Sequence, residues 1–207
     1  DGVIPFREEY KTLAVLGPWA TGQAELLGSW TGDGRASDVT TVLEGLREAV
    51  GSKTRLLHAA GGAEAAAAAL EADAAVVVVG EDATMSGEAA SRSSLDLPAG
   101  QLELLKAVHQ AGKPYAVVLL TGRPLTIPWL AENAPAVLLA WQPGTEGGRA
   151  VADVLTGRKN PGGKLPATFP RSVGQVPLYY AAKNTGRPYD PNSKYTSRYL
   201  DVPNTPL

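Results

Sequence analysis

The residues best suited to chemistry gather in one segment, "GEDATMSGEAASRSSLDLP", which runs from Gly80 to Pro98. Glu88 lies near its middle, Arg92 follows four residues later, and Glu81 and Asp82 lie at the end of the preceding valine-rich strand, after Gly80. A carboxylate on a loop at a ligand-binding edge can act as a general acid or base. Judged by spacing alone, a solvated loop acid is the more common case, so both interpretations of Glu88 stay open.

A second candidate is Trp30, which stands in the glycine-rich stretch "GSWTGDG". A tryptophan flanked by glycines is poorly placed for a core and well placed to offer its ring face to a sugar. A core position or a dimer contact is the alternative. We expect Trp19, Trp129 and Trp141 to be packing residues, because they lie near predicted strand ends or in predicted helices.

Several other kinds of site lack their parts. The stretch from Gly17 to Gly22 has neither the second glycine of a dinucleotide fingerprint nor the Lys-Ser/Thr pair of a phosphate loop. "GSWTG" does not place its serine centrally, as a nucleophile elbow requires. His58 and His109 have no second histidine at ligand spacing, so we expect both to be structural. The sequence therefore predicts no metal and no cofactor.

The composition argues against several classes of partner and of site. The chain has 207 residues, a net charge of -2 and no basic stripe, which argues against nucleic acid. No apolar run approaches the roughly twenty residues of a membrane span, so we expect no membrane segment. The absence of cysteine excludes disulfides and thiol catalysis. The first residues show no signal pattern, so a targeting segment is expected to be absent or removed.

Apolar strands alternate with amphipathic helices along the chain. Strands are predicted within 12–17, 54–61, 74–80, 115–122 and 136–142, and helices within 40–51, 63–74, 97–113, 128–134 and 146–155. The connection between the third strand and the next helix, at residues 81–96, far exceeds the usual two to six residues, which is typical of a functional or a disordered loop. Pro98 is expected near the first turn of the helix that follows, with Gly112 past its end.

This alternation predicts an α/β fold, in which a mostly parallel sheet is sandwiched between helices as in the flavodoxin-like three-layer sandwich. Ligands of such folds lie beyond the carboxyl ends of the strands. We divide the chain into a linker at 1–10, the α/β domain at 11–170 and an extended arm at 171–207. The arm holds five of the seven tyrosines and shows no amphipathic period.

Six motifs in order resemble one family. They are "KTLAVLGP", "GSW", "GEDATMSGEAASRSSLDLPAGQLELLKAV", "LLTGRPLTIPWL", "WQPGTEGGRAVADVLTGRKNPGGKLPATFPRSVGQVPLYY" and "NTGRPYDPNSKYTSRYLD". Together they resemble the second, α/β-sandwich domain of the family-three glycoside hydrolases, in particular of bacterial periplasmic β-glucosidases. The chain is shorter than those relatives between "HAAGG" and "AEAAAAALEADAAVVVVGE".

The resemblance implies a division of labour between two domains. In the family a (β/α)8 barrel precedes this domain and carries the nucleophilic aspartate, while a long loop of the sandwich domain brings the general acid/base. The motif "SGEAASR" places that glutamate at Glu88, and "GSW" makes Trp30 one of the aromatics around the leaving-group sugar. Arg92 also matches and is the third candidate for the substrate site, either ordering the loop or contacting Glu88. Because its charge would oppose a protonated Glu88, we expect Arg92 to bind another partner.

The implied protein is a retaining β-glucosidase that is periplasmic or secreted. Its expected partners are the barrel of the same protein and a β-linked glucoside or gluco-oligosaccharide, while xylosides and a homodimer stay open. This chain has no nucleophile of its own and should be inactive in isolation. The alternatives are a non-catalytic carbohydrate-binding or regulatory module, and a structural domain whose arm braces a neighbour.

Overall fold

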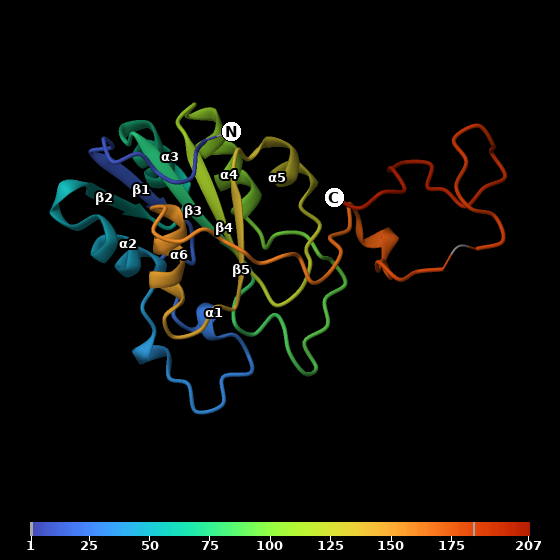
Figure 1. Ribbon diagram of the computed structural model, residues 1–207, viewed down its shortest axis with the longest axis horizontal. Coiled ribbons are helices and arrows are strands. Elements are labelled where there is room, and N and C mark those ends of the chain that lie inside the picture. Colours follow the sequence, from blue (N-terminus) through green and yellow to red (C-terminus); the bar gives the residue numbers. More distant parts are fainter. Residues whose placement is uncertain (1, 184) are drawn as a thin grey trace.

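Five parallel strands form one sheet in the computed structural model, which describes residues 2–183 and 185–207 (Figure 1). The strands are β1 (Thr12–Leu16), β2 (Arg55–Ala59), β3 (Ala74–Gly80), β4 (Tyr115–Leu120) and β5 (Val137–Trp141). Their order in the sheet is β2-β1-β3-β4-β5. This is the flavodoxin-like order, whose direction of winding reverses beside β1 and β3. The predicted α/β fold with a parallel sheet is confirmed.

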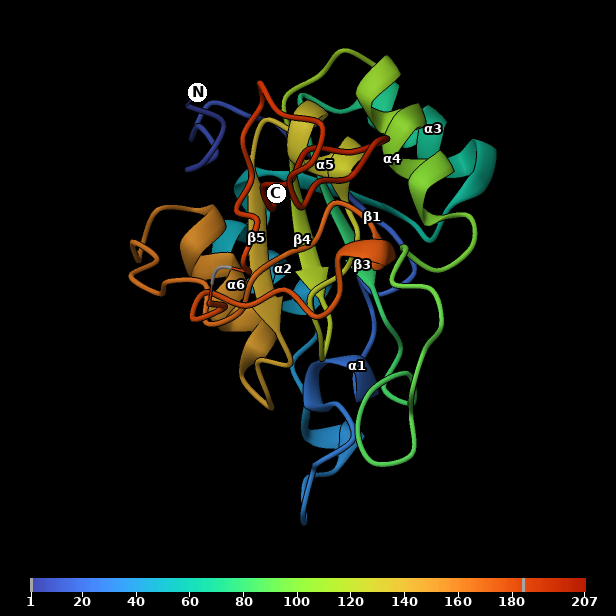
Figure 2. The same ribbon diagram turned by 90° about the vertical axis from the view of Figure 1, so that its right-hand side faces the viewer.

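Helices cover both faces of the sheet (Figures 1 and 2). One face packs against α3 (Gly62–Glu71), α4 (Gln101–Gln110) and α5 (Pro128–Asn133), and the other against α1 (Ala24–Leu27), α2 (Val42–Val50) and α6 (Gly147–Leu155). Three short 3-10 helices are η1 (Ala36–Asp38), η2 (Gly51–Lys53) and η3 (Val173–Gln175). Five of these six α-helices were predicted from the sequence, and α1, which is a single turn, was not.

The two central strands form the core of the domain. Every residue of β3 and β4 is buried. Side chains alternate along a strand, so Val77 and Val79 face α3 and α4, while Val76 and Val78 face α2 and α6. Full burial of one valine side chain contributes roughly 1.5–3 kcal/mol to the hydrophobic stabilisation. The run of valines therefore fixes β3, and with it the position from which the next loop starts.

Helix α4 begins later than predicted. Pro98 was expected near its first turn, but the helix starts at Gln101. Gly100 has a φ of +82°, a left-handed conformation that cannot belong to the helix, and the Gln101 amide donates to the Pro98 carbonyl in a turn. The Gln101 side chain instead bonds both backbone groups of Gly80, at 2.7 and 2.8 Å. The start of α4 is thus tied to the end of β3.

The arm has both ends attached to the domain. Leu207 donates its backbone N–H to the Phe169 carbonyl at 3.0 Å and packs against the core. Buried Gln175 accepts from the Arg171 amide and donates to the Pro203 carbonyl, at 2.7 and 2.9 Å. Figure 1 shows the residues between these anchors projecting away from the sheet on the β5 side.

The domain boundaries at 10/11 and 170/171 stay predictions. Within the described part of 171–207, the structure has no α-helix and no strand. Residue 1 of the predicted linker and residue 184 of the predicted arm lie outside the described residues.

The amino end of α2 carries a capping box that makes its stability depend on pH. Glu44 accepts hydrogen bonds from the backbone N–H of Thr41 at 2.9 Å and from its hydroxyl at 2.8 Å, and these bonds lower the pKa of Glu44 below its ordinary 4.5. A lowered pKa in the folded state means that the stabilisation is present above the unfolded pKa and is lost as the pH falls through the folded one.

We expect Glu44→Ala to lower the free energy of unfolding by about 1 kcal/mol at pH 7, the scale of a hydrogen bond in a folded protein, because the bonds with Thr41 are lost. The deficit should shrink as the pH falls below 4.5 and vanish once Glu44 is protonated in both states. Urea denaturation at several pH values measures it. Glu64→Ala, in the first turn of α3, is the control, because Gly61 offers no side-chain cap there. An equal, pH-independent loss in both variants would contradict the assignment.

Candidate functional site

The predicted site residues lie beyond the carboxyl ends of the strands. Residues 28–41 follow β1 and α1, and residues 81–100 follow β3. Both views show these two segments extending past the same end of the sheet, beneath α1 and β4 in the pictures (Figures 1 and 2). The first segment contains Trp30, and the second contains Glu88 and Arg92. This is the edge where parallel α/β sheets bind ligands.

The loop at 81–100 has no helix and no strand, so side chains from other segments hold it. The Ser29 hydroxyl lies within hydrogen-bond distance of the Ala83 and Ser86 carbonyls, the former at 2.7 Å. Gln142 donates to the Ser86 hydroxyl at 3.1 Å, and the Thr126 amide donates to the Leu95 carbonyl at 2.8 Å. The loops after β1, β4 and β5 therefore all contribute to its position.

Glu88 occupies an exposed point of this loop. Its neighbours Gly87 and Ala89 have φ angles of +113° and +57°. A positive φ at alanine is unfavourable and persists only where the surrounding structure imposes it, a condition that is common at functional sites. Glu88 is thus presented to solvent by a backbone that is bent on either side of it.

Of the four acidic residues between Gly80 and Pro98, three are engaged and one is free. Glu81 is ion-paired, Asp82 accepts from Thr84 at 2.6 and 2.7 Å, and Asp96 bonds the Thr126 hydroxyl. Glu88 makes no hydrogen bond and no ion pair with any residue in the described ranges 2–183 and 185–207. It is the carboxylate of this loop that remains available to another molecule.

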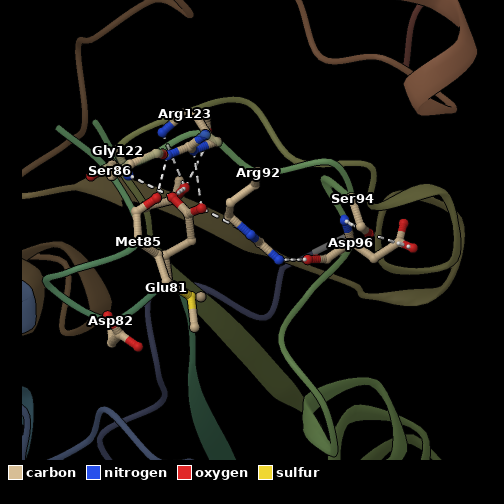
Figure 3. A network of polar contacts seen from close by, with 12 residues as sticks. Glu81, Asp82, Met85, Ser86, Arg92, Ser94, Asp96, Gly122 and Arg123 are labelled. Atoms are coloured by element: carbon tan, nitrogen blue, oxygen red, sulfur yellow. Dashed lines mark hydrogen bonds and ion pairs between the residues drawn. The ribbon is translucent and has the colours of Figure 1, made fainter. Parts of the chain in front are cut away.

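The carboxylate of Glu81 is the centre of a buried polar cluster (Figure 3). It accepts from Arg92 Nη1 at 2.8 Å, from the Thr121 hydroxyl at 2.9 Å and from the Gly122 amide at 3.3 Å. Arg123 Nε lies 3.1 Å from Glu81 Oε1. The two groups form an ion pair, but their alignment is too poor for a hydrogen bond. A buried carboxylate requires such partners, because an unpaired charge in the interior is strongly unfavourable.

Arg92 therefore has another partner than Glu88. Arg92 was expected either to order the loop or contact Glu88, or to bind another partner, and the structure places it on Glu81. The i, i+4 spacing of Glu88 and Arg92 brings side chains together only on a helix, and residues 88–92 form none. A contact between Arg92 and substrate stays a prediction.

Trp30 is exposed over 73% of its surface, so a core position is wrong for this chain. It nevertheless lies against the acidic loop: a Cβ built on Gly87 would come within 3.6 Å of the indole Nε1 and within 2.8 Å of the Ser29 Cβ. Trp30 and the residue before Glu88 are therefore neighbours. The sugar-binding and dimer-contact interpretations of Trp30 both stay predictions.

The remaining tryptophans and the histidines have structural contacts. Trp19, Trp129 and Trp141 pack against the two core clusters, as predicted. His58 Nδ1 lies 2.8 Å from the Val15 carbonyl, and His109 Nδ1 lies 3.1 Å from the Tyr115 hydroxyl.

Two features are absent from the described part of the chain. No three histidine, aspartate or glutamate side chains within it group as ligands of a metal ion. None of its helices combines the length and the apolar composition that crossing a membrane requires.

We predict that Gly87→Ala displaces the acidic loop and lowers the free energy of unfolding by about 2 kcal/mol, because alanine is strained at this φ and its Cβ would collide with Ser29. Chemical denaturation measures the loss. Gly32→Ala is the matched control, since Gly32 also has a positive φ, of +54°, but nothing lies within 4 Å of its added Cβ. A loss no larger than in the control would mean that contact with Ser29 does not hold the loop.

Comparison with known proteins identifies relatives of the whole chain. A model of the glycosyl hydrolase family 3 C-terminal domain matches residues 1–200. The periplasmic beta-glucosidase of Salmonella typhimurium is 43% identical over 228 residues, which cover 95% of this chain and 30% of that protein. The beta-xylosidase of Formosa agariphila is 43% identical over 186 residues, covering 82% and 25%. The chain spans less than a third of either relative.

A solved structure agrees with the sequence relatives. The beta-glucosidase of Listeria innocua in complex with glucose superimposes with a TM-score of 0.91 at 39% identity, covering 100% of this chain and 30% of that one. The Salmonella alignment runs over more residues than this chain contains, so that relative has residues without a counterpart here. That they fall between β2 and α3, which are joined only by residues 60–61, stays a prediction.

Proposed function

The chain belongs to glycosyl hydrolase family 3, as a C-terminal domain, and from this premise we propose that it supplies the general acid/base of a retaining β-glucosidase. The proposal rests mainly on the surroundings of the Glu88 side chain. It is the one acid of the long loop without a partner in the described residues, and it lies exposed at the ligand-binding edge of the sheet.

The proposed chemistry uses two carboxylates from two domains. An aspartate of a preceding (β/α)8 barrel attacks the anomeric carbon, and protonated Glu88 gives its proton to the oxygen of the departing sugar. A glycosyl-enzyme ester forms as the glycosidic bond breaks. Glu88, now a carboxylate, takes a proton from water, which attacks the anomeric carbon and releases the aspartate. Retaining enzymes hold the two carboxyl groups about 5–5.5 Å apart.

This mechanism gives each feature of the loop a role. Glu88 must keep its proton near neutral pH, which enclosure beneath a substrate and a nearby second carboxylate both favour. A positive charge beside Glu88 would oppose this, and Arg92 is held by Glu81 instead. Exposure in this chain is the arrangement expected of a loop that reaches toward a substrate bound by another domain.

The proposed partners follow from the same premise. They are a barrel domain of the same polypeptide and a β-linked glucoside, with periplasmic or secreted placement by analogy with the Salmonella protein. The isolated chain should hydrolyse nothing, because the nucleophile lies outside it.

We predict that Glu88→Ala in the full-length enzyme lowers kcat/KM for cellobiose by 10²–10⁴-fold, the usual contribution of general acid catalysis. For 2,4-dinitrophenyl β-glucoside, whose leaving group needs no proton, kcat/KM should change little. Its kcat should fall, because the glycosyl-enzyme waits for a base, and added azide should restore turnover and yield the glucosyl azide. Initial-rate kinetics and product analysis measure these effects.

Glu103→Ala is the control, since Glu103 is an exposed acid on α4. Full cellobiose activity in Glu88→Ala would remove Glu88 from this role. Sugar binding by the isolated chain together with that result would favour the non-catalytic carbohydrate-binding module.

For Trp30→Ala in the same enzyme, we expect KM for cellobiose to rise roughly tenfold, which corresponds to about 1.4 kcal/mol of lost contact with the second sugar. The KM for an aryl glucoside with a small aglycone should rise less. Trp30→Phe keeps an aromatic face and should recover most of the affinity. Equal changes for both substrates would show that Trp30 does not contact the leaving-group sugar.

A further inference from the structure

Two arginines connect the buried carboxylate of Glu81 to the backbone of the acidic loop (Figure 3). Arg92 donates through Nη1 to Glu81 at 2.8 Å and through Nη2 to the Asp96 carbonyl at 3.0 Å. Arg123, whose Nε is 3.1 Å from Glu81, donates through Nη2 to the Ala90 carbonyl at 2.7 Å and to the Met85 carbonyl. One carboxylate thus orients two guanidinium groups, which bind three carbonyls of the loop.

The carbonyls bound by Arg123 bracket Glu88. Met85 lies three residues before it and Ala90 two residues after it. The loop from Asp82 to Ala90 has two backbone turn hydrogen bonds of its own, from the Met85 amide to the Asp82 carbonyl and from the Ala90 amide to the Gly87 carbonyl. Ser29 and Gln142 also hold Ser86 on the amino-terminal side of Glu88, whereas on its carboxyl-terminal side the Ala90 carbonyl is held by Arg123. The position of the Glu88 backbone therefore depends in part on the guanidinium of Arg123.

The guanidinium groups depend in turn on Glu81. The side chains of Arg92 and Arg123 are only 19% and 21% exposed, and that of Glu81 is 1% exposed. Two guanidinium groups that meet at one carboxylate oxygen would repel each other without its charge, and burying either one unpaired is unfavourable. Removal of the negative charge would release both arginines toward solvent, together with the carbonyls that they hold.

We propose that Glu81 is a positioning residue for Glu88: it fixes the proton donor of the loop at the reacting oxygen through Arg92 and Arg123. The inference rests on the proposed function of Glu88. A general acid acts within about 2.6–3.2 Å of the atom that it protonates, and a misplacement of about 1 Å can cost roughly a hundredfold in rate. Glu81 itself contacts no substrate in this scheme.

Glu81→Gln in the full-length enzyme tests the proposal, because the amide keeps the shape of the side chain and removes its charge. We expect kcat/KM for cellobiose to fall about 10- to 100-fold, and kcat/KM for 2,4-dinitrophenyl β-glucoside to fall less than about threefold. In the Glu88→Ala background, Glu81→Gln should change cellobiose hydrolysis less than about twofold, since residues that act through one another are not additive.

Glu48→Gln is the matched control. Glu48 also pairs with an arginine, Arg149 at 2.7 Å, but on the exposed surface between α2 and α6. Glu48→Gln should leave kcat/KM unchanged for both substrates, in the wild-type enzyme and in the Glu88→Ala background. An equal loss on the two substrates, or an additive loss in the Glu88→Ala background, would overturn the positioning role and make Glu81 a residue of stability alone.

Arg92→Lys keeps the experiment decisive if Glu81→Gln does not fold. A single ammonium group retains the charge beside Glu81 but cannot reach both Glu81 and the Asp96 carbonyl as the planar fork does. We expect kcat/KM to fall several-fold for cellobiose alone. Amide hydrogen exchange should become faster in residues 82–96 and stay unchanged in β3. No selective loss would contradict the proposal.

The two proposals fail separately. If Glu88→Ala hydrolyses cellobiose normally, the proposed function is wrong whatever Glu81→Gln does. If Glu88→Ala is impaired and Glu81→Gln and Arg92→Lys are not, Glu88 keeps its role and only the positioning role of Glu81 is lost.

Discussion

The parallel direction of all five strands is the constraint on which the rest of this domain depends. It brings every strand's carboxyl end to one edge, so loops distant in sequence meet there. It also requires helices on both faces of the sheet. The valines of β3 point alternately to the two faces and supply apolar surface to both helical layers. Residues from the loops after β1, β4 and β5 consequently converge on the loop after β3, and the buried charge of Glu81 lies where they meet.

Much of this could be predicted from the sequence because the signals are local. Apolar runs identified the strands, and glycine, proline and acidic clusters marked the loops between them. The start of α4 was predicted too early, because Pro98 suggested a first turn there, whereas the left-handed backbone of Gly100, with a φ of +82°, keeps the preceding residues out of the helix. The contact of Gln101 with Gly80, 21 positions away, could not be predicted from local sequence.

The residues of the candidate site also include some that could be predicted from the sequence and some that could not. Glu88 could be selected because it lies midway along an unusually long loop and matches the motif "SGEAASR", and Trp30 because its glycine-rich surroundings make it a poor core residue. The roles of Arg123 and Ser29 could not, because each acts on a loop that is distant in sequence, across 33 positions for the bond from Arg123 to Ala90. Arg92 was expected to bind a partner other than Glu88, but the sequence did not identify that partner as Glu81, eleven positions earlier. Such partners follow only from the sheet order.

Because the arm is attached to the domain at both of its ends, a change in its length need not alter the geometry of the sheet. Leu207 returns to Phe169, so the chain leaves the domain and re-enters it at one spot. The entropy of closing such a loop grows only slowly with the number of residues in it. Evolution can therefore lengthen, shorten or recompose this excursion, and a protein engineer can insert a reporter into it, while the edge of the sheet that carries Glu88 keeps its architecture.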